Sequence, residues 1–195
     1  MENHQFDIVA MAASAGGLAA LSKVLSLLPG DFPVPVVVVE HLDPRRRSAM
    51  AEILSRRTSL PATEARAGEH LEPRRVYIAP PDNHLLIASD GTVSLSHSEL
   101  VHFVRPSADL LFESVAAAYK DRAIAVVLSG SGVDGNLGVK AVKKMGGTVI
   151  AQNQKSSQFF GMPDAAIQTG CVDFILALED IPAALIKLVM KGERP

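Results

Sequence analysis

Short apolar runs alternate along this chain with stretches in which apolar side chains recur every three or four residues. Ile8–Ala12 is wholly apolar, and leucines then recur at helical spacing over Leu18–Leu28 until Pro29 and Gly30 end the pattern. Strands are predicted at Ile8–Ala12, Val34–Val39, Thr63–Ala65, Arg75–Ala79, Leu85–Ala88, Thr92–Leu95, Ile124–Leu128, Thr148–Ala151 and Phe174–Leu176. Helices are predicted at Leu18–Leu28, Arg47–Thr58, Ala108–Tyr119, Leu137–Met145, Asp164–Thr169 and Ile181–Lys191.

This order of elements predicts an α/β fold. Strands separated by helices of about ten residues form βαβ units, which give a mainly parallel, twisted sheet covered by helices on both faces. Asp90-Gly91 lies between two short strand patterns and indicates a small β-hairpin. We therefore expect one three-layer α/β/α domain over residues 1–195, because no linker or internal repeat divides the chain.

Composition narrows the class of protein. The chain has 195 residues, 48% of them apolar, and a formal net charge of −2, which argues against a general nucleic-acid binder. Its apolar runs are shorter than the roughly 20 residues of a membrane span, so membrane insertion is not expected. The N-terminus has no pattern of a secretory signal, and the single Cys171 fits a reducing compartment. A cytoplasmic protein is predicted.

Three polar residues follow the ends of predicted buried strands. Ser14 comes after Ile8–Ala12, at the start of a helix whose free backbone N–H groups could bind an oxyanion. His41 ends a run of four valines, and Asp134 lies in the loop after Ile124–Leu128. Carboxyl ends of parallel strands converge on one crevice, so the three residues can supply a nucleophile, a base and an orienting acid.

Each of these residues also has an ordinary structural explanation. Serine before a helix is a common N-cap, a histidine at a strand end is often structural, and an aspartate between glycines often forms a turn. His84, just past another strand, is the alternative base. Ser14, His41 and Asp134 therefore indicate a catalytic site only when they are taken together.

Nucleotide binding is the competing interpretation of the loop after Ile124–Leu128. Residues 130–135 read Gly-Ser-Gly-Val-Asp-Gly, a literal G-x-G-x-x-G. Asp134 would place a carboxylate beside a pyrophosphate, and the next strand ends in Gln152 and Asn153 with no acid for the ribose. No metal site is predicted either, since the histidines are scattered and Cys171 is alone.

The run Arg45–Arg47, a few residues after His41, has two interpretations. It is either a solvated loop or a basic rim beside the crevice, suited to an acidic partner.

Several segments resemble, in order and over almost the whole chain, the chemotaxis receptor methylesterases, that is, the CheB-type protein-glutamate methylesterase/glutaminase catalytic domain. The turn Ala13–Gly17 is similar to the A-S-x-G-G turn of that family, and Glu40-His41-Leu42 to its histidine segment. The other similar segments are Gly68-Glu69 with Val76–His84, Arg105–Phe112, Gly130–Gly135, Ala151–Asn153 and Phe160–Pro163.

The resemblance implies hydrolysis of glutamate γ-methyl esters on cytoplasmic helices of methyl-accepting chemotaxis receptors, releasing methanol, with glutamine deamidation as a second activity. It implies Ser14 as nucleophile, His41 as general base and acid, and Asp134 as the orienting carboxylate, with no cofactor. Backbone N–H groups near Ala15 and Ser131 would hold the oxyanion. Arg105 is expected to position substrate.

The chain departs from the family pattern in three places. Ser131 stands where members often have methionine, and Val104 stands where a histidine is common. Members usually have an N-terminal receiver domain, which this chain does not contain; it is either free-standing or a fragment. Two alternative functions stay open: a non-catalytic helix-binding module of the same fold, and a serine hydrolase that acts on another substrate.

Overall fold

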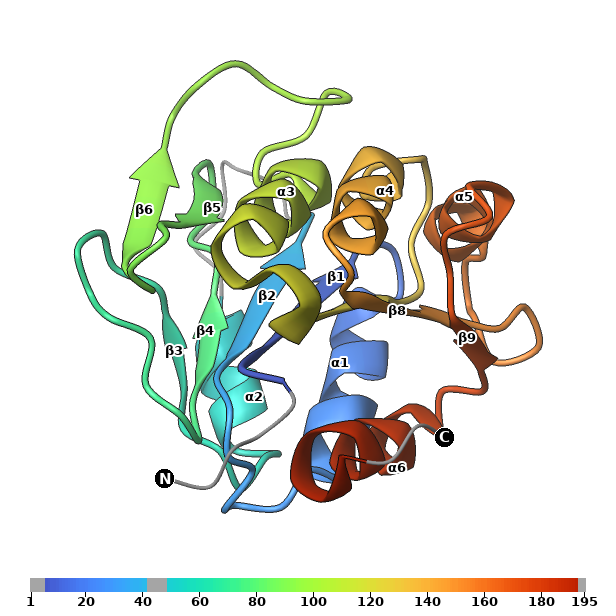
Figure 1. The fold of residues 1–195 in the computed structure, drawn as a ribbon, viewed down its shortest axis with the longest axis horizontal. Coiled ribbons are helices and arrows are strands. Elements are labelled where there is room, and N and C mark those ends of the chain that lie inside the picture. The colour runs from blue at the N-terminus through green and yellow to red at the C-terminus, as the bar shows by residue number, and fades with distance from the viewer. Residues whose placement is uncertain (1–5, 42–48, 193–195) are drawn as a thin grey trace.

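A seven-stranded parallel sheet forms the centre of the computed structural model, which describes residues 6–41 and 49–192 (Figure 1). Its strand order is β3-β4-β2-β1-β7-β8-β9, and every neighbouring pair is parallel. The strands are β1 (Ile8–Ala13), β2 (Val36–Glu40), β3 (Ala62–Glu64), β4 (Val76–Ile78), β7 (Ala123–Val127), β8 (Thr148–Gln152) and β9 (Phe174–Leu176).

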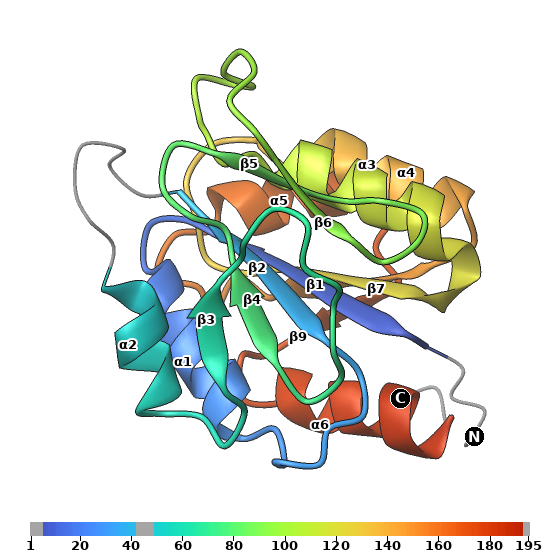
Figure 2. The same cartoon turned by 90° about the vertical axis from the view of Figure 1, so that its left-hand side faces the viewer.

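Helices cover both faces of this sheet (Figure 2). One face packs against α1 (Gly17–Ser26), α2 (Met50–Ser55) and α6 (Ile181–Ile186), which continues into a π-helical turn at Lys187–Lys191. The other face packs against α3 (Ala108–Tyr119), α4 (Asn136–Lys144) and α5 (Gly161–Gln168), together with the separate antiparallel hairpin of β5 (His84–Ile87) and β6 (Val93–Ser96). A short 3₁₀ turn at Lys120–Arg122 joins α3 to β7. The predicted three-layer fold with a small hairpin is confirmed.

Alternation along the strands separates two apolar cores. In β1, for example, Val9 and Met11 belong to the core under α1, whereas Ile8 and Ala10 belong to the core under α3. Because both faces are covered, central strands need apolar residues at every position, which is why their sequences read as continuous apolar runs. No helix within the described ranges is long and apolar enough to cross a membrane.

Most element boundaries agree with the predictions to within two residues. Two helices differ more. α5 begins at Gly161, before the predicted start at Asp164, and Pro163 is tolerated because it lies in the first turn, where its missing N–H breaks no bond within the helix. α2 covers only Met50–Ser55. The first residues of the predicted helix Arg47–Thr58, and the run Arg45–Arg47 with it, lie outside the described residues.

Glu40, the last residue of β2, places a buried carboxyl against the first turn of α1. The side chain is only 6% exposed, accepts a hydrogen bond from the Leu18 N–H, and has no ion-pair partner within the described ranges. Its Oε1 lies 2.7 Å from where a Cβ on Gly17 would be, so the glycine provides the space for it. Burial raises the pKa of Glu40 from 4.5 to about 7, and the hydrogen bond from Leu18 lowers it by less.

Glu40→Gln is expected to stabilise the protein at pH 8 and to have little effect at pH 4.5. The raised pKa means that the folded protein binds more protons than the unfolded chain between pH 4.5 and about 7, so wild-type stability falls as the pH rises through this window. Glutamine keeps the acceptor without the charge, and the gain at pH 8 should be roughly 1–3 kcal/mol. Denaturant unfolding at the two pH values measures it, with Glu64→Gln, an exposed carboxyl on β3, as control. An equal change at both pH values would contradict a raised pKa.

Candidate active site

Ser14, His41 and Asp134 come together at the carboxyl edge of the sheet, where three adjacent strand ends meet. β1 pairs with β2 on one side and with β7 on the other, so the chain changes direction across the sheet at β1. Main-chain hydrogen bonds continue past the strands, with Ser14 N donating to Ser129 O at 3.0 Å and His41 N donating to Ala13 O at 3.2 Å. The topology therefore fixes the backbone around Ser14 and His41.

Asp134 is held at the N-terminus of α3. Its Oδ1 accepts hydrogen bonds from the Ser107 hydroxyl at 2.8 Å and the Asp109 N–H at 3.3 Å, and its Oδ2 accepts one from the Ala108 N–H at 2.5 Å. Burial alone would raise the pKa of this carboxyl, which is 3% exposed, but the hydrogen bonds from His41, Ala108 and Ser107 lower it below its ordinary value. A buried but ionised carboxylate results, close to the positive end of a helix.

His41 faces this carboxylate. Its Nε2 lies 2.8 Å from Asp134 Oδ2, and its side chain is 10% exposed. An ionised carboxylate can only accept hydrogen bonds, so Nε2 of the neutral His41 ring must carry the proton that is donated to Asp134. Nδ1 is then the nitrogen that can act as a base.

Ser14 begins a tight turn that leads into α1. Gly17 N donates to Ser14 O at 2.6 Å, and Gly16 has a φ of 75°, which favours glycine. The Ser14 side chain is half-buried, and no hydrogen bond joins it to His41 among the contacts of the described residues. Catalytic hydrogen bonds are often long in free enzymes and shorten when substrate is bound.

The loop after β7 lies directly against Ser14. A Cβ on Gly130 would be 3.0 Å from Ser14 Cβ and would overlap the Met162 sulfur, so only glycine lets the loop approach this closely. Ser131 follows on the exposed side of the loop. The two predicted oxyanion donors, Ala15 and Ser131, thus belong to segments that touch at Ser14.

Sequence reasoning missed the residue that joins these segments. The Ser129 hydroxyl, buried, donates to Ala15 O at 2.8 Å and accepts from Phe159 N at 3.0 Å. Its own N–H donates to Gln152 Oε1 at 2.8 Å, and the Gln152 amide donates to Ser156 O. The sequence does contain one sign of this contact: Gln152 is a polar residue at the end of the buried strand β8.

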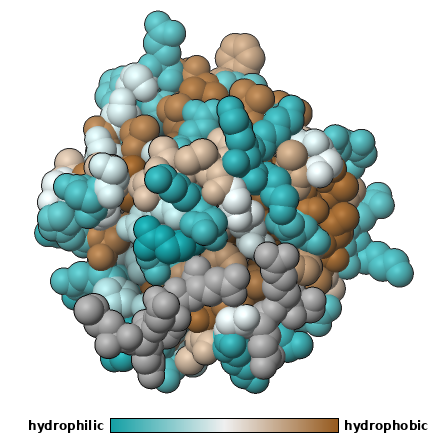
Figure 3. Space-filling model, in the orientation of Figure 1, coloured by the Kyte–Doolittle hydropathy of each residue, from teal (hydrophilic) through white to brown (hydrophobic). Residues whose placement is uncertain are grey.

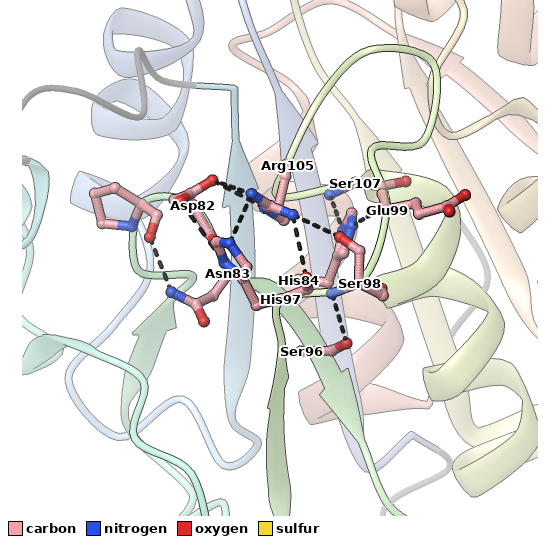
Figure 4. Close-up of polar contacts among 10 residues, drawn as sticks. Asp82, Asn83, His84, Ser96, His97, Ser98, Glu99, Arg105 and Ser107 are labelled. Atoms are coloured by element: carbon pink, nitrogen blue, oxygen red, sulfur yellow. Dashed lines mark hydrogen bonds and ion pairs between the residues drawn. The ribbon is translucent and has the colours of Figure 1, made fainter.

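His84, the alternative base, has both ring nitrogens engaged with the main chain (Figure 4). Nδ1 accepts from the Ser107 N–H at 3.1 Å and Nε2 donates to Glu99 O at 3.0 Å, and the side chain is fully buried. The ring therefore supports the segment that begins α3 and has no free nitrogen for a substrate.

Arg105 uses its guanidinium within its own chain (Figure 4). Nε and Nη2 donate to Asp82 Oδ1 at 2.9 and 2.6 Å, and Nη1 donates to Ser98 O at 2.6 Å. These contacts anchor the loop between β6 and α3. The role of Arg105 in positioning substrate stays a prediction.

Asp109 is a second buried carboxyl next to Asp134. Its Oδ1 accepts the Gly138 N–H at 2.8 Å and its Oδ2 pairs with His102 Nε2 at 3.1 Å. Burial and the nearby charge of Asp134 raise the pKa of Asp109, and the Gly138 N–H opposes this. Ligand atoms of His102, Asp109 and Asp134 lie within 4.8 Å of one another, the one such cluster in the described part of the chain, and hydrogen bonds within the chain account for the positions of its carboxylates.

A groove of about 730 Å³ lies elsewhere, between α2, β3 and the segment that follows β3. Its walls carry charges of both signs, including Glu52, Arg56, Glu64 and Arg66. None of the predicted site residues lines it, so its volume does not bear on the chemistry of Ser14.

Comparisons with known proteins show the family and the fold of this chain. The family model described as CheB methylesterase matches residues 9–185. A solved structure, the catalytic domain of CheB methylesterase from Thermotoga maritima, superposes with a TM-score of 0.90 at 40% identity and covers 94% of this chain and 99% of that domain. The fold of this chain thus resembles that of a solved methylesterase catalytic domain.

Sequence relatives extend over nearly all of the chain. One from Leptospira interrogans is 37% identical over 183 residues, which are 94% of this chain and 95% of the relative. The protein-glutamate methylesterases/protein-glutamine glutaminases of Thermotoga maritima and Moorella thermoacetica are 41% and 38% identical. This chain spans about half of these two, 54% and 44% of their lengths. The resemblance inferred from the sequence motifs is confirmed: the chain belongs to the CheB methylesterase family.

Proposed function

We propose that this protein hydrolyses glutamate γ-methyl esters on the cytoplasmic helices of methyl-accepting chemotaxis receptors, releasing methanol, and deamidates glutamine at such positions. One observation carries the proposal. A His41–Asp134 pair with a 2.8 Å hydrogen bond lies at the strand end next to Ser14, in a family of methylesterases. Relatives of this chain are named protein-glutamate methylesterase/protein-glutamine glutaminase, which supports methyl-esterified glutamate and glutamine side chains as the substrate class.

The proposed acylation step uses these three side chains. His41 Nδ1 takes the Ser14 hydroxyl proton as Oγ bonds to the ester carbonyl carbon, and the N–H groups of Ala15 and Ser131 stabilise the oxyanion. Methoxide is too basic to leave unaided, so the imidazolium returns the proton and methanol departs. Asp134 stabilises the imidazolium through the Nε2 hydrogen bond.

Deacylation uses the same groups. His41 takes a proton from water, the hydroxide attacks the glutamyl ester of Ser14, and the proton returns to Oγ, giving glutamate and free enzyme. With glutamine as substrate, ammonia leaves in the first step in place of methanol. Substitution of Ser131 for the methionine common in the family leaves a backbone donor in place.

Ser14→Ala is expected to lower methanol release from methylated receptor by about three orders of magnitude or more, because it removes the nucleophile. Gas chromatography of released methanol measures this, with Ser94→Ala, an exposed serine of β6, as control. The melting temperature of both variants should stay close to that of the wild type. Near-normal release by Ser14→Ala would refute the proposed mechanism, and absence of release by the wild type would favour a binding module or another substrate.

The two histidines should respond differently to alanine. His41→Ala is expected to reduce turnover about a thousandfold with little loss of stability, since its ring is a reacting group at the edge of the sheet. His84→Ala should instead lower the melting temperature, because the buried Ser107 N–H loses its acceptor and the ring no longer bonds to the Glu99 carbonyl. Turnover per folded molecule should fall far less than in His41→Ala. Turnover at a temperature where both variants are folded gives the comparison. The reverse ranking would assign the base to His84.

A further inference from the structure

The loop between β6 and α3 contains a tight two-residue turn that exposes an aromatic ring. Val101 and Val104 exchange both main-chain hydrogen bonds, at 3.2 and 2.9 Å, and the residues between them, His102 and Phe103, have φ values of 50° and 64°. Positive φ at both central residues of a two-residue turn normally selects Asn-Gly or Gly-Gly. A bulky side chain is strained in this conformation. Phe103 is nonetheless there, with 94% of its surface exposed.

This turn is fixed beside the candidate active site. His102 pairs with Asp109 at 3.1 Å, and ligand atoms of His102, Asp109 and Asp134 all lie within 4.8 Å of one another. Arg105 anchors the following residues to Asp82 and to the Ser98 carbonyl. The turn that presents Phe103 is therefore attached within a few ångströms of the carboxylate that orients His41.

Two other loops at the site also expose apolar side chains. Val133, directly before Asp134, is 47% exposed, and Phe159, whose main chain bonds to Ser129 and Gly130, is 44% exposed. Figure 3 shows that the face of the molecule seen in Figure 1 is mixed, with apolar areas between polar side chains. We define Phe103, Val133 and Phe159 as the apolar rim.

We propose that the apolar rim is the contact surface for the receptor helix that carries the reacting glutamate, and that Phe103 packs on apolar residues one turn away from that glutamate. The proposal rests on the proposed function, because it takes Ser14 as the nucleophile. A protein side chain that reacts at Ser14 brings its own backbone up to the loops around Ser14. Residues three and four positions from the glutamate lie on the same face of its helix, so they are the groups that meet these loops.

Phe103→Gly separates a docking role from a structural role. Glycine relieves the positive φ, so the melting temperature should be unchanged or higher, whereas loss of a structural side chain would lower it. KM for methylated receptor should rise about 5- to 30-fold, because truncation of an aromatic side chain at the centre of an interface weakens binding by about this much. The kcat should stay within about twofold of the wild-type value. Hydrolysis of a small neutral methyl or nitrophenyl ester should be unchanged.

Leu27→Gly is the matched control. Leu27 is 48% exposed and lies at the C-terminal end of α1, at the opposite edge of the sheet from Ser14. This variant should leave KM for receptor as in the wild type.

Three results would overturn the inference. An unchanged KM for receptor in Phe103→Gly would remove the docking role, and equal losses on receptor and small ester would make Phe103 a support of the catalytic groups. Dimerisation of the wild type in sedimentation velocity that disappears in Phe103→Gly without a change in KM would make the rim a self-association surface. Full activity of Ser14→Ala would instead refute the proposed function itself, so the two failures are distinguishable.

Discussion

The carboxylate of Asp134 is buried among atoms that would ordinarily favour its protonated form, and the N-terminus of α3 keeps it ionised. Two main-chain N–H groups and the Ser107 hydroxyl donate to it, in addition to His41. Without these donors the desolvation cost would raise the pKa of Asp134, and the His41 ring would lose the partner that decides which nitrogen carries its proton. His84 and the loop held by Arg105 matter because they fix Ser107 and the start of α3.

Parallel topology supplies the rest of the arrangement. β1 lies between β2 and β7, so the segments bearing Ser14, His41 and Asp134 leave the sheet at three neighbouring positions on one edge. Glycines at 16 and 130 let the turn after β1 and the loop after β7 approach each other, and Ser129 bonds them together. Glu40, at the end of β2, is a buried carboxyl under α1 that has no charged partner among the described residues.

Much of this could be predicted from the sequence, because apolar periodicity reports burial directly. The strands of the parallel sheet, the hairpin at Asp90-Gly91 and the helix Ala108–Tyr119 were all predicted, as was the convergence of the strand ends that carry Ser14, His41 and Asp134. Local patterns do not report contacts made across the fold. The bonds of Ser129 to Ala15 and of Ser107 to Asp134 depend on the packing of distant segments, and the Val101–Val104 turn does not have the residues typical of its geometry. The expected role of Arg45–Arg47 stays a prediction, since these residues lie outside the described ranges.

The central claim is that Ser14 reacts as a nucleophile activated by the His41–Asp134 pair. Labelling with a fluorophosphonate, in which the serine oxygen bonds to phosphorus and fluoride leaves, followed by peptide mass spectrometry, tests it most directly. The account predicts a single adduct on Ser14, formed much more slowly in Asp134→Asn, whose side chain keeps the shape of the carboxylate without its charge. Labelling of another residue, or the same rate in Asp134→Asn as in the wild type, would contradict it.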